Sequence, residues 1–225
     1  MTWVKICGTT NLRDAQLSVV AGADALGFIF APSPRQVEIE AATEIIAAIA
    51  GRVETIGVFV DESPERIAEV ATRAGLSGVQ LHGDEPASMF RQFRCALGNR
   101  KIVKTLHARE LVKSTRMLAE CLLARDSIDA ILLDSGSPQQ RGGTGTQFAW
   151  NDALPIAAEI RRAMPLIIAG GLNADNVRHA IELFDPWGID VVSGVEGSPG
   201  NKDEGKLLDF MAAVRQTQAS ARQRE

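Results

Sequence analysis

Apolar and polar positions along the chain follow two alternating patterns. Short runs of apolar, often β-branched residues recur, and most are followed by a longer stretch with the apolar spacing of a helix. The first pattern is typical of buried strands and the second of amphipathic helices. The short runs predict strands over residues 3–7, 24–30, 53–60, 78–82, 101–106, 129–134, 165–170 and 190–193. The longer stretches predict helices over residues 12–21, 40–49, 64–74, 111–124, 152–163, 175–184 and 206–216.

The alternation of eight strands with helices predicts the fold class. Ser63 before Pro64 is suited to start a helix, and Gly22 and Gly75 are suited to end one. A doubly wound sheet needs fewer strands and usually a G-x-G-x-x-G loop after the first strand, but the chain reads Cys-Gly-Thr-Thr from Cys7. We therefore expect an α/β protein, a single (β/α)8 TIM barrel with a parallel eight-stranded core over residues 1–225, with a polar tail from about residue 217.

Composition narrows the classes of function. The chain is 45% hydrophobic and 23% charged with a formal net charge of −4, so we expect no broad basic face for nucleic acid. No apolar run is long enough to cross a membrane, and the first residues lack the pattern of a signal peptide. Three widely spaced cysteines and three scattered histidines form neither a disulfide framework nor a metal-ligand spacing. These features predict a cytoplasmic protein that binds no metal, nucleic acid or membrane.

Glycines gather in the loops where barrels of this kind often bind phosphate, after the last strands. Gly170 and Gly171 follow the seventh predicted strand, Gly194 follows the eighth, and a Gly-Gly-Thr-Gly run over residues 142–145 follows the sixth. Backbone N–H groups approach an anion closely at glycine because no Cβ intervenes. The alternative is that these glycines only form tight turns. We expect a phosphate site at these loops.

Two reactive side chains end strands on different parts of the predicted barrel. Strand alternation places Cys7 on one face with Lys5, and Asp134 on one face with Leu132. If both faces point inward, a thiol and a carboxyl group meet over one pocket, as a general base and a general acid. The base role needs a nearby cation, because the pKa of free cysteine is about 8.5, and Lys5 is the candidate. The alternatives are a small buried hydrophobe for Cys7 and a loop cap for Asp134.

Two further polar residues stand at strand ends. Arg35 follows the second strand in a loop stiffened by Pro32 and Pro34, and a guanidinium binds a carboxylate through two parallel hydrogen bonds. The alternative is a solvated surface arginine. His82 ends the fourth strand, where it is suited to contact a ligand, act as a base, or bind a loop carbonyl.

Short segments with a characteristic order run through almost the whole chain. They are Val4-Lys5-Ile6-Cys7-Gly8, Gly27-Phe28-Ile29-Phe30 with Ser33-Pro34-Arg35, Gly57-Val58-Phe59-Val60, Val79-Gln80-Leu81-His82-Gly83, Leu133-Asp134-Ser135, Gly142-Gly143-Thr144-Gly145 with Phe148 and Trp150, Ala169-Gly170-Gly171-Leu172 with Asn176-Val177, and Ser193-Gly194-Val195-Glu196 with Gly200 and Lys202-Asp203. This ordered set resembles the phosphoribosylanthranilate isomerase family of the tryptophan pathway. The family often has an apolar residue at the position of Thr9 and a serine at that of Val192, and neither departure removes a catalytic group.

The resemblance implies an Amadori rearrangement without a cofactor or metal. The implied substrate is N-(5-phosphoribosyl)anthranilate, and the product is 1-(2-carboxyphenylamino)-1-deoxyribulose 5-phosphate. By matching position, Asp134 is the general acid for the ring oxygen, Cys7 the general base for the C2 proton, and Arg35 the residue that holds the anthranilate carboxylate. Together with the strand-end positions, this predicts a substrate-binding set of Arg35, His82, Gly143, Gly145, Gly170, Gly171, Ser193 and Gly194.

Other functions of the same fold remain as alternatives. The related histidine-pathway isomerase acts on a similar aminoaldose. A resemblance to that family would imply a mechanism with two aspartates and an acidic residue at the position where this chain has Cys7. A metal-dependent epimerase needs several histidines and carboxylates at strand ends, and only His82 is so placed. A phosphate-binding barrel without catalysis needs neither Cys7 nor Asp134. We expect a small phosphosugar substrate as the partner, and a monomer or homodimer.

Overall fold

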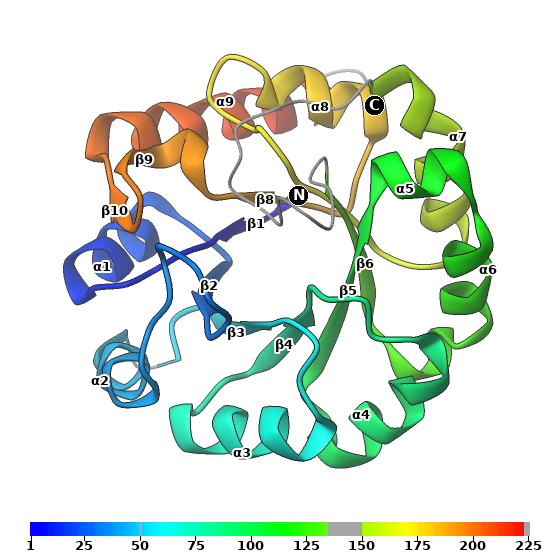
Figure 1. The fold of residues 1–225 in the computed structure, drawn as a ribbon. Helices are drawn as coiled ribbons and strands as arrows, with labels where there is room; N and C mark the ends of the chain where they lie inside the picture. The colour runs from blue at the N-terminus through cyan, green and yellow to red at the C-terminus, as the bar shows by residue number, and fades with distance from the viewer. Residues whose placement is uncertain (50, 135–149, 223–225) are drawn as a thin grey trace.

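Eight parallel strands close into a barrel in the computed structural model, which describes residues 1–49, 51–134 and 150–222 (Figure 1). The strands pair in chain order, and β1 closes the barrel against β8 with Lys5 beside Asp190. This arrangement confirms the predicted (β/α)8 barrel. The strand bounds are β1 (Trp3–Ile6), β2 (Ala25–Ile29), β3 (Glu54–Phe59), β4 (Gly78–Leu81), β5 (Lys101–His107), β6 (Ala130–Asp134), β7 (Leu166–Ile168) and β8 (Gly188–Val191).

Helices form a ring outside these strands (Figure 1). They are α1 (Leu12–Ala21), α2 (Ile39–Ile49), α3 (Pro64–Ala74), α4 (Phe90–Leu97), α5 (Ala108–Lys113), α6 (Arg116–Leu123), α7 (Trp150–Ala163), α8 (Val177–Phe184) and α9 (Glu204–Arg222). Three 3-10 turns and a two-stranded hairpin complete the described elements: η1 (Ala87–Met89), η2 (Arg125–Ser127), η3 (Ser193–Val195), β9 (Glu196–Ser198) and β10 (Asn201–Lys202). Across these described residues, no helix is both long and apolar enough to span a membrane.

Helix ends follow the local sequence signals. Ser63 accepts a hydrogen bond from the Arg66 backbone amide at the start of α3, and Pro64 occupies the first turn, where its missing N–H costs nothing. Gly22 and Gly75 end α1 and α3 in the left-handed conformation, with φ of 95° and 72°. The prediction of one helix over residues 111–124 is wrong. Ser114 adopts an extended backbone (φ −156°) that separates α5 from α6.

The interior of the barrel is layered from apolar to polar. Side chains from alternating strand positions form a small apolar cluster inside the barrel, and a larger cluster fills the space between strands and helices. The inner cluster comprises Trp3, Ala25, Ile56, Val103, Ala130, Leu132, Ile167 and Ala169. Nearer the carboxyl ends of the strands, the inward positions become polar, with Lys5, Gln80, Thr105 and Asp190 all buried. The fold therefore presents ionisable groups at the end of the barrel where its loops gather.

Candidate active site

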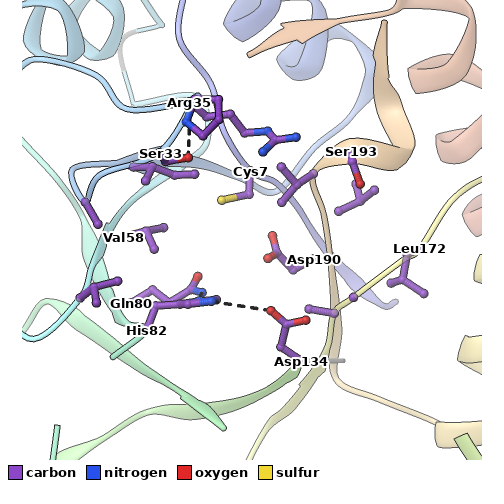
Figure 2. Close-up of a pocket in the computed structure, with 18 of the residues that line it drawn as sticks. Cys7, Ser33, Arg35, Val58, Gln80, His82, Asp134, Leu172, Asp190 and Ser193 are labelled. Atoms are coloured by element: carbon purple, nitrogen blue, oxygen red, sulfur yellow. Dashed lines mark hydrogen bonds and ion pairs between the residues drawn. The ribbon is translucent and has the colours of Figure 1, made fainter. Parts of the chain in front are cut away.

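A cavity of about 400 Å³ lies at the carboxyl ends of the strands (Figure 2). Its walls come from every strand end or following loop except that of β5. Seven of the ten residues predicted for the site line it: Cys7, Arg35, His82, Asp134, Gly170, Gly171 and Ser193. Gly194 lies next to this wall, in η3, while Gly143 and Gly145 lie outside the described residues. The structure therefore brings the thiol and the carboxyl group into one cavity, as strand alternation predicts.

Cys7 directly follows β1 and is buried, with its side chain on the cavity wall. Burial raises the pKa of the Cys7 thiol, and the charge and hydrogen-bonding capacity of Lys5 oppose that rise without cancelling it. Asp190 raises the pKa of Cys7 further, because its negative charge disfavours a thiolate. We expected Lys5 to lower the pKa of Cys7. Lys5 does act in that direction, but the net shift is upward because burial and Asp190 outweigh it.

Lys5 and Asp190 form a buried ion pair beside Cys7. The Lys5 Nζ atom lies 2.9 Å from Asp190 Oδ1, and the two residues are neighbours in the register of β1 and β8. Their side chains are 1% and 6% exposed, and Asp190 also lines the cavity, between Cys7 and Asp134 in Figure 2. Sequence reasoning missed Asp190, although its position near the start of the predicted eighth strand was a signal for an inward-facing carboxylate.

Asp134 ends β6 and faces His82 across the cavity (Figure 2). The His82 Nε2 atom lies 3.7 Å from Asp134 Oδ2. On the other side of the ring, His82 Nδ1 lies 2.8 Å from the side-chain amide nitrogen of Gln80 and 3.1 Å from the Thr105 hydroxyl. An amide nitrogen only donates, so in this arrangement Nδ1 accepts and Nε2 carries the proton that points toward Asp134. Gln80 and Thr105, which sequence reasoning missed, thus orient His82.

Arg35 lines the cavity, but its guanidinium already holds a carboxylate of the protein. Its Nε atom and one terminal nitrogen contact the Glu196 carboxylate at 2.7–3.0 Å in a bidentate geometry. The aliphatic part of Arg35 lies against the backbone of Gly8, where a Cβ atom would come within 2.9 Å of Arg35 Cδ. Within the described part of the chain, the two N–H bonds of the other terminal nitrogen have no acceptor and are available to a ligand. The predicted surface alternative is wrong, because Arg35 is buried.

Glu196 and Lys202 connect the hairpin of β9 and β10 to Arg35 and to the backbone of Cys7. Lys202 Nζ donates to the Cys7 carbonyl oxygen at 2.6 Å and to Glu196 Oε1 at 3.1 Å. Burial lowers the pKa of Lys202, whereas Arg35 and Lys202 together lower the pKa of Glu196 in spite of its burial. Sequence reasoning assigned no role to either residue, because an irregular hairpin of this length has no periodic pattern.

Glycine backbones form the wall at the ends of β7 and β8. Gly170 and Gly171 have φ of 94° and 65°, a conformation that other residues rarely adopt. The Asn176 side chain fixes this turn by donating to the Gly171 carbonyl at 2.9 Å. A Cβ atom at Gly194 would overlap the Leu172 carbonyl oxygen, so only glycine lets the two loops pack together. The glycines thus build a tight double loop next to the cavity.

Among the described residues, no group of three or more His, Cys, Asp or Glu side chains is placed to hold a metal ion. The carboxylates near Cys7 are instead bound to cations of the protein: Asp190 to Lys5, and Glu196 to Arg35 and Lys202. The arrangement places a thiol, a carboxyl group and an imidazole around one cavity, with buried positive groups on the thiol side.

Comparison with known proteins identifies the family of the chain. A family model described as N-(5'-phosphoribosyl)anthranilate (PRA) isomerase matches residues 4–213. A relative of that name from Pelobacter propionicus is 43% identical over 222 residues, covering 98% of this chain and 99% of the relative. Another from Geobacter metallireducens is 42% identical over 212 residues, covering 94% and 98%. The crystal structure of phosphoribosyl anthranilate isomerase from Thermotoga maritima is similar, with a TM-score of 0.82, 39% identity, and coverage of 96% and 100%. The chain therefore belongs to the N-(5'-phosphoribosyl)anthranilate isomerase family.

Proposed function

We propose that this chain converts N-(5'-phosphoribosyl)anthranilate to 1-(2-carboxyphenylamino)-1-deoxyribulose 5-phosphate, the isomerase step of tryptophan biosynthesis. The observation that carries the proposal is the single cavity that Cys7 and Asp134 line from β1 and β6. One structural neighbour, 38% identical to this chain, is phosphoribosyl anthranilate isomerase in complex with reduced 1-(o-carboxyphenylamino)-1-deoxyribulose 5-phosphate. An acid and a base on separate strands suit a reaction that protonates one atom of a sugar and deprotonates another.

In the first step, Asp134 gives its proton to the furanose ring oxygen of the substrate. The C1–O bond then breaks, and the nitrogen lone pair forms an iminium at C1. This leaves Asp134 as a carboxylate in a buried position, where a charged group needs a partner. The His82 N–H that points toward Asp134 provides that partner. His82 is accordingly a positioning residue for the acid.

In the second step, the Cys7 thiolate takes the C2 proton, and the electrons of the C–H bond form the double bond of an enolamine. Loss of the C2 hydroxyl proton and protonation of C1 then give the ketone. Burial keeps the Cys7 pKa high in the free protein, so a thiolate is disfavoured until a positive charge arrives. The iminium formed in the first step is such a charge, one bond from C2. Ring opening thus favours loss of the Cys7 thiol proton to solvent, which forms the thiolate next to C2, and solvent returns a proton to Asp134.

The two charged ends of the substrate need separate parts of the cavity wall. Arg35 holds the anthranilate carboxylate through its remaining N–H bonds, or through the N–H bonds that it otherwise donates to Glu196. When Arg35 releases Glu196, that carboxylate still has Lys202 as a partner. The phosphate binds to backbone amides of the loops after β7 and β8, around Gly171, Ser193 and Gly194. Gly143 and Gly145, which the sequence predicts for the same site, lie outside the described residues.

The test is turnover of freshly prepared N-(5'-phosphoribosyl)anthranilate by the wild type and by Asp134→Asn, with a chelator present. We expect turnover by the wild type and a loss of at least about 10²-fold in kcat for the variant. His179→Gln on α8 is a matched control, since its ring stacks on Trp150 on the helical side of the barrel. Absence of turnover by folded wild-type protein would refute the proposal and direct the assay to the histidine-pathway aminoaldose.

A further inference from the structure

Lys5 is among the largest side chains that are fully buried in the described part of the protein, and its partner Asp190 lines the cavity. One N–H donates to Asp190 Oδ1 at 2.9 Å. An ammonium group has three donors, so this ion pair leaves two of them for other acceptors. Because β1 alternates, Lys5 and Cys7 share the inward face of the strand, and the Cys7 sulfur is the next group along it.

Gly27 on β2 brings the lysine and the thiol together. A Cβ atom at position 27 would lie 2.5 Å from Cys7 Sγ and 3.0 Å from Lys5 Cε. Both side chains therefore pack against the backbone of Gly27, which has no side chain and lies on the strand next to β1. The missing side chain creates the space in which the two groups meet.

The ion pair is hard to explain as a stabilising element. A buried pair of opposite charges often contributes less to stability than apolar side chains of the same volume, because two ions lose their hydration. Apolar side chains already fill the next inward layer of the barrel. A lysine and an aspartate at this level therefore indicate a role in the chemistry of the cavity.

We propose that Lys5 is the counter-charge and hydrogen-bond donor of the Cys7 thiolate, and that Asp190 is the positioning residue that holds Lys5 in place. This inference rests on the proposed function, in which Cys7 is the base. Lys202 also lowers the pKa of Cys7, but less than Lys5 does, and its hydrogen bonds go to other atoms. Lys202 donates to the Cys7 carbonyl oxygen and to Glu196, and Arg35 also binds Glu196. Asp134 faces His82.

The proposal gives the two partners opposite effects on the same thiol. Lys5 lowers the pKa of Cys7, and Asp190 raises it. Replacing Lys5 by methionine, which keeps most of the volume, removes the cation and disfavours the thiolate. Replacing Asp190 by asparagine removes a repulsive charge and leaves the ammonium group to the sulfur. A purely structural role for the pair predicts no such difference in sign.

The experiment titrates Cys7 directly, through the pH dependence of its alkylation by iodoacetamide in a Cys95→Ala, Cys121→Ala background. We expect Lys5→Met to move the midpoint up by about 1–3 pH units and Asp190→Asn to move it down. The matched control is Lys104→Met, which removes another buried lysine. Lys104 lies on β5, across the barrel from β1, and its ammonium group pairs with Glu85 at 2.6 Å. Its Cys7 midpoint should equal that of the parent. Unfolding melts of each variant show which of them are folded.

An unchanged midpoint in Lys5→Met, or shifts of the same sign in both variants, would overturn the proposal. If Lys5→Met does not fold, the isosteric Asp190→Asn carries the test alone, and a midpoint that stays or rises overturns it. In turnover, Lys5→Met should lower kcat and leave KM nearly unchanged, because Lys5 does not line the cavity. The titration needs no turnover, so it separates this proposal from the proposed function. Full activity of Cys7→Ser would refute the base role, whatever the midpoints show.

Discussion

The space beside Gly27 gives a direct test of how accurately the thiol must be placed. In Gly27→Ala, the new methyl group would lie 2.5 Å from Cys7 Sγ, whereas ordinary van der Waals contact begins at 3.4 Å. The sulfur must therefore move by about 0.9 Å, or Lys5 and the backbone must share that movement. The methyl group also lies 3.0 Å from Cys7 Cβ and from Lys5 Cε, so rotation of the thiol alone does not relieve the overlap.

A displacement of this size has separate consequences for stability and for rate. Overpacking a buried position costs about 1–3 kcal/mol in the free energy of unfolding. A misplacement of about 1 Å in a reacting group costs about 10²-fold in rate. We therefore expect kcat for N-(5'-phosphoribosyl)anthranilate to fall about 100-fold. KM should change little, because Gly27 does not line the cavity and the proposed carboxylate and phosphate contacts lie elsewhere.

Gly57→Ala is a matched control for the general cost of a methyl group in a barrel strand. A Cβ atom there would lie 2.5 Å from Leu76 Cδ1 and 2.7 Å from Phe59 Cε2, an overlap similar to that at Gly27. Leu76 and Phe59 belong to the cluster between strands and helices, away from the thiol. Both variants should lose stability, and only Gly27→Ala should lose turnover. Wild-type kcat in folded Gly27→Ala, or equal loss in Gly57→Ala, would refute the reasoning.

Other substitutions and a labelling experiment test the remaining assignments. Cys7→Ser should lose about 10²–10⁴-fold in kcat while still binding product in a calorimetric titration, and undiminished activity would remove Cys7 from the mechanism. Arg35→Ala should raise KM by about 10- to 100-fold through loss of a charge-assisted contact, and an unchanged KM would contradict the carboxylate role. At neutral pH, alkylation followed by mass spectrometry should label exposed Cys95 first. Burial raises the pKa of Cys121 to about 11, so this thiol should stay unmodified until the protein unfolds, and early labelling would contradict its burial.

The fold could be predicted from sequence because its signals are local and repeat. Apolar runs locate each of the eight barrel strands to within a few residues, and β5 extends only one residue beyond the predicted end, to His107. Ser63 and Gly75 mark the limits of α3 through cap hydrogen bonds made within a few residues. The division of residues 111–124 into two helices was not predictable in this way, because Ser114 and Thr115 are compatible with either arrangement.

The candidate site was predictable in its positions but not in its electrostatics. Alternation and strand ends placed Cys7 and Asp134 in one cavity. The same reasoning used Lys5 to lower the thiol pKa, and it failed because burial raises that pKa and because Asp190, 185 residues further along the chain, shares the Lys5 ammonium group. Arg35 has its carboxylate partner Glu196 at a separation of 161 residues. Such partners follow from strand register and from a hairpin, and neither is encoded in the local pattern.

Three polar contacts near the thiol cross the seam where the barrel closes. Lys5 of β1 binds Asp190 of β8, the Lys202 ammonium group binds the Cys7 carbonyl oxygen, and Arg35, after β2, binds Glu196 of β9. These bonds join the first two βα units to β8 and to the hairpin that follows it, so they belong to the closed barrel, in which β8 pairs with β1. Until the seam closes, Cys7 lacks the burial that raises its pKa, and Lys5, its neighbour on β1, lacks Asp190 as a partner. The ionisation behaviour of the base is therefore a property of the closed barrel, and the titration midpoint of Cys7 reports that closure as well as the chemistry.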